Sequence, residues 1–414
     1  MTRPTRLAAL AAAPILLALL AGCGKGPTVP KVIPPLSSIV LTPPLDTMQV
    51  GQSRAFTAVA RDTSGAIVST YLNWAVSNPA VISVTGQGSV TARGEGVALL
   101  IASGGGAADT STIFVYPDTG WIAQTSNALE DLHGVHFRPD GRHGWVVGAA
   151  GVVLRTTDAG VTWTRSIPTT FSLNAVWFLD DTTGFAVGNS GTVLETSDRG
   201  DSWTRLTGVN TSLNLMDVTF ALSDSLIGWA VGQNGVVLRT IDRGATWQMG
   251  FVNTQTLHGV SFAGARDGWA VGDNGMIAGT HDRGLTWFVV QPSVTALGLE
   301  SVWRADSATA LAVGAQGVAP RSIAGVDSVE WALQNAGSAF TLNGVCLSGG
   351  AGFAVGSNGG AGAVVRTDDV GATWQAQTPR SQFKLNDVFF VDRPRGWAVG
   401  DNGTIRHTAR GGGS

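Results

Sequence analysis

Seven tryptophans recur every 40–44 residues along the C-terminal two thirds of this chain. They are Trp121, Trp163, Trp203, Trp247, Trp287, Trp331 and Trp374. A period of this length is that of one four-stranded β-propeller blade, so it constrains the architecture more than any other feature.

A second marker keeps the same period but is out of phase with the tryptophans. It is the glycine that closes each "GWAVG"-like segment: Gly148, Gly188, Gly232, Gly272, Gly314, Gly356 and Gly400. Trp121 has no complete repeat before it, and the repeat that begins at Gly400 has no tryptophan. We therefore predict seven blades, with residues 120–131 supplying the missing strand of the last blade and closing the ring.

The composition agrees with an all-β protein rich in turns. Charged residues make up 13% of the 414 residues, and 56 residues are glycine. The formal net charge is −3, and no stretch is strongly basic, which argues against nucleic-acid binding.

The first residues have the pattern of a bacterial lipoprotein signal. Arg3 and Arg6 precede an apolar run that is too short to cross a bilayer, and Leu20-Ala21-Gly22-Cys23 resembles a lipobox. We expect residues 1–22 to be removed, Cys23 to be lipidated, and the protein to be anchored in the cell envelope at the outer membrane. An ordinary signal peptide with an incidental cysteine is the alternative. Residues 23–36 contain four prolines and form an extended linker.

Residues 37–117 alternate short β-type runs with turn residues. Seven such runs, with Trp74 as the core aromatic residue, predict an Ig-like β-sandwich. The order "LTPP…FTAVARDTSGAIV…LNWAVSNPAVISV" resembles the bacterial Ig-like group 2 family. That resemblance implies a spacer more than an adhesion module.

Residues 118–414 form the predicted propeller. Its first strands share a column of valines, each preceded by a small or short residue: Gly134, Ala175, Asp217, Gly259, Ser301, Gly344 or Asp387. Short side chains are expected where seven inner strands crowd a central channel. Asn-Gly pairs, such as Asn234-Gly235, supply the positive φ angles of the tight turns after the second strands.

Five blades carry the motif [S/T]-x-D-x-G-x-x-W between their third and fourth strands. Its aspartates and tryptophans are Asp158 with Trp163, Asp198 with Trp203, Asp242 with Trp247, Asp282 with Trp287, and Asp369 with Trp374. The motif resembles the Asp-box (BNR repeat) of sialidases, sortilins and xyloglucanases. The aspartate can accept N–H groups of its own turn, so we interpret the motif as structural. Ala324 and Arg410 replace the aspartate in blades five and seven, whose turns should be the loosest.

The composite repeat "GWAVGDNGTIxxTxDxGxTW" resembles the photosystem II assembly and stability factor family. That resemblance covers about 290 residues and implies a seven-bladed, non-enzymatic propeller that binds a protein partner. The Ig-like module and the lipid anchor depart from the photosynthetic pattern, so the photosystem itself is not transferred.

A glycosidase is the rival class. A sialidase-like site needs a tyrosine nucleophile, but Tyr71 and Tyr116 both precede the propeller. A xyloglucanase-like site lies between two propellers, and one is predicted. A carboxylate pair on one ring stays open: Asp217, Glu300 and Asp387 begin inner strands, and Asp273 and Asp401 lie in turns on the same face. Solvated turn residues are the simpler interpretation.

Metal and cofactor sites have little support. His133 and His258 hold matching positions three blades apart, where the other blades carry Asn174, Met216, Glu300, Asn343 and Asn386. We expect this ring of mostly polar residues to line the channel mouth rather than to bind metal.

Two surfaces remain as candidates for partner binding. One is a column of arginines just before the Asp-box: Arg155, Arg239, Arg321 and Arg366. These either form a patch for an anionic partner or are wedged between blades. The other is the channel mouth, with Asp217, Asp387, His133, His258 and Glu300 and the loop aromatics Phe171, Phe251, Phe340 and Phe383. We favour the mouth.

The sequence therefore predicts an exported, monomeric, non-enzymatic protein with an Ig-like sandwich and a seven-bladed propeller. Its expected partner is a protein, or alternatively a surface glycan that it binds or hydrolyses. No cofactor, metal or nucleic acid is expected.

Overall fold

The computed structural model describes residues 36–116, 120–221, 223–304, 306, 309–322, 330–337, 339–348, 350–377 and 381–411. The predicted signal segment, Cys23 and the linker up to residue 35 lie outside these residues, as do residues 117–119. Regular structure in the described part consists of β-strands and short 3₁₀ turns. Within it, no helix has the length and apolar character needed to cross a membrane.

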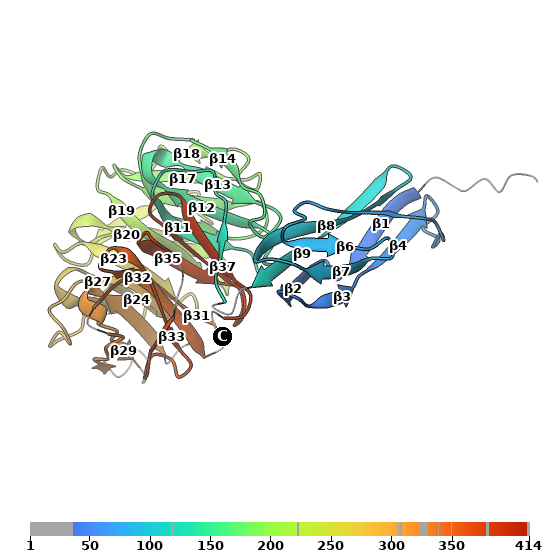
Figure 1. Ribbon diagram of the computed structural model, residues 1–414. Helices are drawn as coiled ribbons and strands as arrows, with labels where there is room; N and C mark the ends of the chain where they lie inside the picture. The colour runs from blue at the N-terminus through green and yellow to red at the C-terminus, as the bar shows by residue number, and fades with distance from the viewer. Residues whose placement is uncertain are drawn as a thin grey trace, which may run out of the picture.

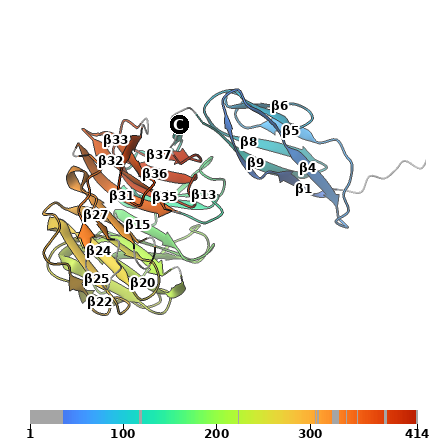
Figure 2. The ribbon, with the colours of Figure 1, turned by 90° about the horizontal axis from the view of Figure 1, so that it is seen from below.

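The N-terminal strands pack around one apolar cluster that includes Leu41, Phe56, Ile82 and Leu100. Their sheets have the orders β1-β4, β2-β9-β8-β5 and β3-β7-β6, and this body lies beside the ring of later strands in Figures 1 and 2. The sequence predicted seven runs here, and the structure has nine strands. They are β1 (Leu36–Thr42), β2 (Leu45–Gln49), β3 (Ser53–Ala55), β4 (Thr57–Asp62), β5 (Asn73–Val76), β6 (Ile82–Val84), β7 (Ser89–Ala92), β8 (Gly96–Gly104) and β9 (Ala107–Tyr116).

The described residues from 120 onward form a β-propeller of seven four-stranded sheets, which we number as blades 1–7. The inner strands are β11 (Leu132–Phe137), β15 (Leu173–Phe178), β19 (Leu215–Ala221), β23 (Leu257–Phe262), β27 (Leu299–Arg304), β31 (Phe340–Ser348) and β35 (Leu385–Phe390). The second strands are β12 (Gly144–Gly148), β16 (Gly184–Gly188), β20 (Asp224–Gly232), β24 (Gly268–Gly272), β28 (Ala310–Gly314), β32 (Ala351–Asn358) and β36 (Gly396–Gly400).

The third and fourth strands lie farther from the centre. The third strands are β13 (Val153–Thr156), β17 (Thr192–Thr196), β21 (Val236–Thr240), β25 (Met276–Thr280), β29 (Arg321–Ser322), β33 (Ala361–Thr367) and β37 (Thr404–Thr408). The outer strands are β14 (Thr164–Ser166), β18 (Thr204–Arg205), β22 (Gln248–Phe251), β26 (Phe288–Val289), β30 (Trp331–Ala332), β34 (Gln375–Gln377) and β10 (Ile122–Gln124).

Blade 7 is completed by a strand from the N-terminal side of the ring. Strand β10 pairs antiparallel with β37, with Ile122 opposite His407 and Gln124 opposite Ile405. The edge of β37 that would otherwise be open is therefore paired, which holds the two ends of the ring together.

Stacked aromatic rings hold neighbouring blades together. The ring on the second strand of one blade stacks on the phenylalanine of the next inner strand, as Trp229 does on Phe262 with centroids 3.4 Å apart. Trp287 of the Asp-box then packs edge-on against Phe262 at 6.0 Å. Trp121 makes the same edge-on contact with Phe390 in blade 7, at 6.2 Å. In these blades the periodic tryptophan packs on the phenylalanine of its own blade, and that phenylalanine in turn stacks on the preceding blade.

Blade 5 departs from this stacking pattern. Arg304 stands where most inner strands have phenylalanine, and Trp331 packs directly on Trp269 at 5.1 Å. At the next interface Leu311 and Leu347 replace the stacked rings. Strands β29 and β30 are also only two residues long each. The Ala324 turn of this blade lies outside the described residues.

The N-terminal sheets join the propeller at blade 7. Phe114 and Tyr116 of β9 belong to one apolar cluster with Trp397. The Tyr116 hydroxyl lies 2.8 Å from Nδ1 of His407, a residue that is 1% exposed. Strand β9 packs against the residues that precede the seventh turn. The looseness of that turn near Arg410 stays a prediction, because residues 412–414 lie outside the described part.

Candidate binding site in the central channel

The polar ring predicted at the channel mouth coincides with a repeated β-bulge. Each described inner strand shifts register by one residue just after its first leucine, for example between Leu132 and Gly134. The extra residues are His133, Asn174, Met216, His258, Glu300, Asn343 and Asn386, and all of them line the central cavity. A bulge redirects a side chain out of the regular alternation, which explains why one position in every blade faces the channel.

In four blades the bulge side chain bonds to the next blade. His133 Nδ1 lies 2.9 Å from the Leu173 carbonyl oxygen, and Asn174 donates to the Leu215 carbonyl at 2.7 Å. Asn343 and Asn386 make the equivalent bonds, to Leu385 at 2.8 Å and to Leu132 at 2.9 Å. These four residues therefore hold the ring together.

The other three bulge residues form a different sector of the mouth. Met216, His258 and Glu300 follow one another in blades 3, 4 and 5. His258 Nε2 lies 2.9 Å from Asp273 in the following turn, and its Nδ1 lies 3.7 Å from Glu300. The imidazole is thus held between two half-exposed carboxylates, while the Met216 sulfur lies 3.8 Å from the Asn174 amide nitrogen of the preceding blade. We call Met216, His258, Asp273 and Glu300 the mouth sector.

Asp217 and Asp387 do not belong to the mouth. They lie one residue further along β19 and β35, half-buried in the channel wall, and each carboxylate accepts two backbone N–H groups. Asp217 accepts from Val218 at 2.8 Å and from Val260 of the next blade at 2.9 Å. Asp387 accepts from Val388 at 2.8 Å and from Val135 at 2.9 Å. Their interpretation as solvated turn residues is therefore wrong, because they bridge adjacent inner strands.

The glycines of the same column explain why these bridges are possible. A Cβ on Gly134 would lie 2.9 Å from Ala175 Cα, and one on Gly344 would lie 2.9 Å from Asp387 Cα. The inner strands are therefore in backbone contact. Such close approach puts a carboxylate within reach of an N–H group on the neighbouring strand.

Burial in the channel wall destabilises both carboxylates. It raises the pKa of Asp217 to about 7, against the opposing effect of the Val260 N–H, and the nearby Asp387 raises it further. Burial likewise raises the pKa of Asp387 to about 6. Both groups consequently titrate near neutral pH.

The channel itself is a cavity of about 470 Å³, walled by all seven inner strands of the described ring. Among the described residues, no group of three or more His, Cys, Asp or Glu side chains is placed to hold a metal ion. Cys346 is fully buried on β31.

The arginine column lies between blades. Arg155 pairs with Asp201 of the next Asp-box turn, and Arg239 donates to the Arg283 carbonyl at 2.7 Å. Arg366 donates to the Gly411 carbonyl of the last blade at 3.4 Å and pairs with Asp368 of its own turn at 2.7 Å. Arg321 is half-buried on β29. Of the two interpretations left open by the sequence, these contacts favour interblade wedges.

The four phenylalanines predicted for partner-binding loops do not form a set. Phe171 and Phe383 lie in loops and are 37% and 40% exposed. Phe251, 57% exposed, is the last residue of β22. Phe340 begins β31 and packs against an apolar cluster. The loop placement of Phe251 and Phe340 is therefore wrong, because strand pairing extends further than the sequence pattern suggested.

The Asp-box aspartates bond within their own turns. Asp242, for example, accepts from the Thr246 N–H at 2.9 Å, the Thr246 hydroxyl at 2.6 Å and the Thr240 hydroxyl at 2.7 Å. Asp158, Asp198, Asp282 and Asp369 make the same three bonds. These carboxylates have their acceptor sites occupied by the turn.

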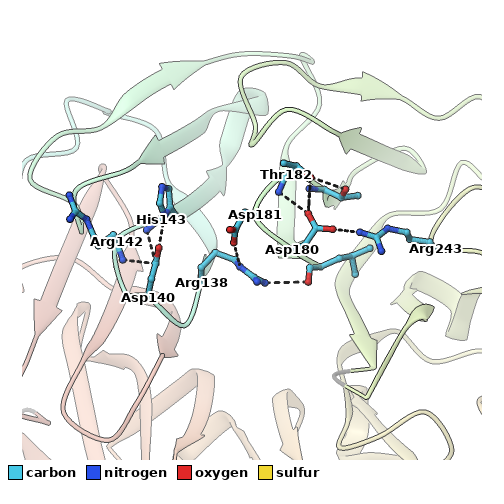
Figure 3. Close-up of polar contacts among 10 residues, drawn as sticks. Arg138, Asp140, Arg142, His143, Asp180, Asp181, Thr182 and Arg243 are labelled. Carbon is cyan, nitrogen blue, oxygen red and sulfur yellow. Dashed lines mark hydrogen bonds and ion pairs between the residues drawn. The ribbon is translucent and has the colours of Figure 1, made fainter. Parts of the chain in front are cut away.

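A charged cluster joins the loops between the first and second strands of blades 1 and 2 with Arg243 in the Asp-box turn of blade 3 (Figure 3). Arg138 bonds to Asp181 at 3.1 Å, and Arg243 pairs with Asp180. Although partial burial opposes it, the N–H of Thr182 and the charge of Arg243 help to hold the pKa of Asp180 to about 2. The charges in this cluster face one another, so it is better explained as a link between blades than as a docking patch.

Comparison with known proteins finds a family match for part of the ring. Residues 117–212 and 206–302 match the family described as Photosynthesis system II assembly factor YCF48. This part of the propeller is similar in sequence to that family. A structure titled "YCF48 bound to D1 peptide" superposes with a TM-score of 0.59 and 19% identity, over 71% of this chain and 96% of that one. A search of curated proteins finds no match.

Two further structures share the fold. YCF48 from Cyanidioschyzon merolae has a TM-score of 0.57 and 20% identity, over 70% of this chain and 98% of its own. The WD40 propeller domain of Doa1 has a TM-score of 0.55 and 11% identity, over 70% and 97% of the two chains. At these sequence identities the structural similarity shows the β-propeller fold alone. The similarity to YCF48 rests on the sequence match.

Sequence reasoning missed two parts of the site. Asp273 was noted as a turn residue but was not linked with His258, its contact in the structure. His136 was not singled out, although it is 5% exposed and lies in the cavity wall. The equivalent positions of three other inner strands hold the aromatic residues Trp177, Trp303 and Phe389. A histidine in this column is the signal that could have revealed His136.

Proposed function

We propose that this protein is an exported, lipid-anchored, non-enzymatic scaffold whose seven-bladed propeller docks a protein partner through the mouth sector. In this proposal residues 1–22 are the signal, 23–36 the linker, 37–117 an Ig-like spacer and 118–414 the propeller. The lipid on Cys23 holds the protein at the outer membrane, and the propeller acts as a monomer.

The mouth sector is the observation that supports this proposal most directly. Elsewhere the bulge side chains bond to the neighbouring blade, whereas Glu300 and Asp273 engage His258 and keep half-exposed carboxylates at the surface. Met216 adds a flexible apolar contact, of a kind suited to a protein surface. The YCF48 structure with a D1 peptide supports peptide binding as a use of this type of propeller.

Carbohydrate binding or glycoside hydrolysis is the second candidate, because a general acid needs a raised pKa such as that of Asp217. Against hydrolysis, both Asp217 and Asp387 are bonded to inner-strand N–H groups. A panel of glycosides tests this alternative. Hydrolysis that is lost in Glu300→Gln or Asp217→Asn would replace the scaffold proposal.

Photocrosslinking tests the docking face. A photoreactive amino acid is placed at Met216, with Asn343 on a bonded part of the ring as the matched control, and the protein is irradiated in envelope membranes. We expect one discrete adduct from position 216 that Glu300→Gln weakens. Equal labelling from both positions would contradict a specific sector.

Metabolic labelling tests the anchor. We expect labelled palmitate to appear on the protein and to be lost in Cys23→Ala. If the variant and the wild type fractionate alike without label, the anchor is absent.

A further inference from the structure

The channel has an aromatic layer below its two carboxylates. Its members each follow a valine of the inner-strand column: His136, Trp177, Thr219, Ser261, Trp303, Cys346 and Phe389. Residues two apart on a strand share a face, so this layer lies roughly 7 Å along the strands from Asp217 and Asp387. Six of the seven, all except Cys346, line the cavity.

Four rings of this layer form a continuous arc. His136 lies between Trp177 and Phe389, with centroid distances of 4.8 Å and 4.7 Å. Phe389 in turn meets Trp303 edge-on at 6.2 Å, passing the small Cys346 of the blade between them. The hydroxyls of Thr219 and Ser261 occupy the remaining blades. Because the two tryptophans and Phe389 are half-buried in the cavity wall, part of each ring stays accessible from the channel.

His136 contributes a polar group that the fold does not use. It is 5% exposed, and its buried Nδ1 has no hydrogen-bond partner among the described residues. Burial, together with the charge of Arg138, lowers the pKa of His136 to about 3. The ring is therefore neutral at physiological pH, and it adds no positive charge that would repel a cation in the channel.

Carboxylates and cations both surround the aromatic arc, and Arg138 beside His136 is one of the cations. Asp217 and Asp387 lie above the arc, and Glu300 lies at the mouth. Arg304 lines the lower end, where it donates to the Asp306 carbonyl at 2.9 Å and is also close to Asp267. Lys384 is near the mouth. The two carboxylates already accept N–H groups of neighbouring strands, but burying them is costly, and a cation in the channel would offset that cost.

We propose that the central channel binds an organic ammonium group, with Trp177, Trp303 and Phe389 against its alkyl or methyl groups and Asp217 and Asp387 as counter-charges. Aromatic faces attract such cations, and a desolvated site strengthens the attraction. The ammonium is carried either by a free compound such as choline or by a lysine side chain of a protein. This site is separate from the mouth sector and does not depend on it.

Calorimetric titration of the full chain tests the site. The probes are choline, its uncharged analogue in which carbon replaces nitrogen, and N-acetyl-lysine amide with and without three Nζ methyl groups. We expect choline to bind at least about tenfold more tightly than the uncharged analogue, which corresponds to roughly 1.4 kcal/mol. Binding by choline alone indicates a free ligand, and binding by the lysine probes indicates a protein side chain.

Variants connect the binding to the channel. Trp177→Leu and the double change Asp217→Asn with Asp387→Asn should each weaken choline binding at least about tenfold. Ile241→Ala, in the exposed Asp-box turn of blade 3, should leave it unchanged. The docking proposal has its own readout in crosslinking from Met216, so the two failures are distinguishable. Melting curves show whether each variant is folded. If Trp177→Leu is unfolded, the double Asp→Asn variant is used for the comparison instead.

Proton release gives an independent readout. A cation beside Asp217 lowers its raised pKa, so binding at pH 7 should release protons, seen as a heat that depends on the ionisation enthalpy of the buffer. The proposal is overturned if no ammonium probe binds, if the uncharged analogue binds equally well, or if the carboxylate variants bind choline like the wild type.

Discussion

Two aspartates in the channel wall combine a structural bond with an electrostatic cost. Asp217 and Asp387 each receive an N–H from the next blade, yet burial raises both pKa values well above that of a free aspartate. In the unfolded chain both titrate near 3.9. The folded state therefore holds more protons than the unfolded state between about pH 4 and pH 7.

This difference predicts an unusual pH dependence. A raised folded pKa stabilises the fold below the unfolded pKa, and that contribution is lost as pH rises through about 6 to about 7. We expect the melting temperature to fall between pH 5 and pH 8, and to fall less in Asp217→Asn. Differential scanning calorimetry across this range checks it. A melting temperature that rises over the same range in the wild type, or an equal fall in the variant, would contradict the assignment.

Aromatic contacts between strands set the stability of each blade interface. Phe178 is stacked between blades, 3.4 Å from Trp145 and 5.8 Å edge-on from Trp203. Removing such a ring leaves a cavity that both neighbouring blades line, and a rigid β-structure relaxes into it only partly.

We predict that Phe178→Ala lowers the free energy of unfolding by about 3–5 kcal/mol. The matched control is Phe171→Ala, because that ring is 37% exposed and should cost under about 1 kcal/mol. Urea denaturation followed by tryptophan fluorescence measures both. Similar losses in the two variants would show that the interblade stack is not a main source of stability.

Blade 5 should open before its neighbours. It has Arg304 in place of the stacked phenylalanine, and β29 and β30 have two residues each. Few backbone hydrogen bonds and a weaker interface lower the free energy of local opening. We expect amide protons of β29 and β30 to exchange faster than those of β21 and β22 in hydrogen-exchange mass spectrometry. Equal protection of the two blades would show that the ring opens only as a whole.

In the described part of the chain, the N-terminal sheets and blade 7 share an apolar core. Phe114 and Tyr116 of β9 pack with Trp397 and His407, and β10, the next strand in the chain, completes the blade. Closure of the ring and attachment of the N-terminal sheets are therefore coupled, since consecutive strands make the two contacts.

We predict that Tyr116→Phe destabilises the propeller as well as the N-terminal sheets. The change leaves Nδ1 of the buried His407 without its partner, which costs about 1–3 kcal/mol. Calorimetry should show one transition in the wild type and a lower melting temperature in the variant. Two separate transitions, with the melting temperature of the propeller unchanged, would show that the N-terminal sheets unfold independently of the propeller.

Much of the propeller could be predicted from the sequence because its signals are local and repeated. The spacing of the tryptophans, the turn glycines and the Asp-box residues each reports contacts within one blade or between adjacent repeats. The extra Trp121 even indicated the donated strand, which pairs with β37.

The binding site depended on contacts that no local pattern encodes. Arg155 pairs with Asp201 and Asp217 bonds to Val260, and each contact joins residues about 40 positions apart in the chain. No local pattern distinguishes these contacts from an exposed arginine or a solvated aspartate. The bulge at His258 brings its ring near Glu300, and the aromatic arc joins Trp303 to Phe389 past Cys346. Both arrangements arise only when seven strands converge. The sequence by itself determined the repeat and its turns, because those are short-range. The tertiary structure decided which polar and aromatic side chains the channel brings together, because convergence around an axis is a property of the closed ring.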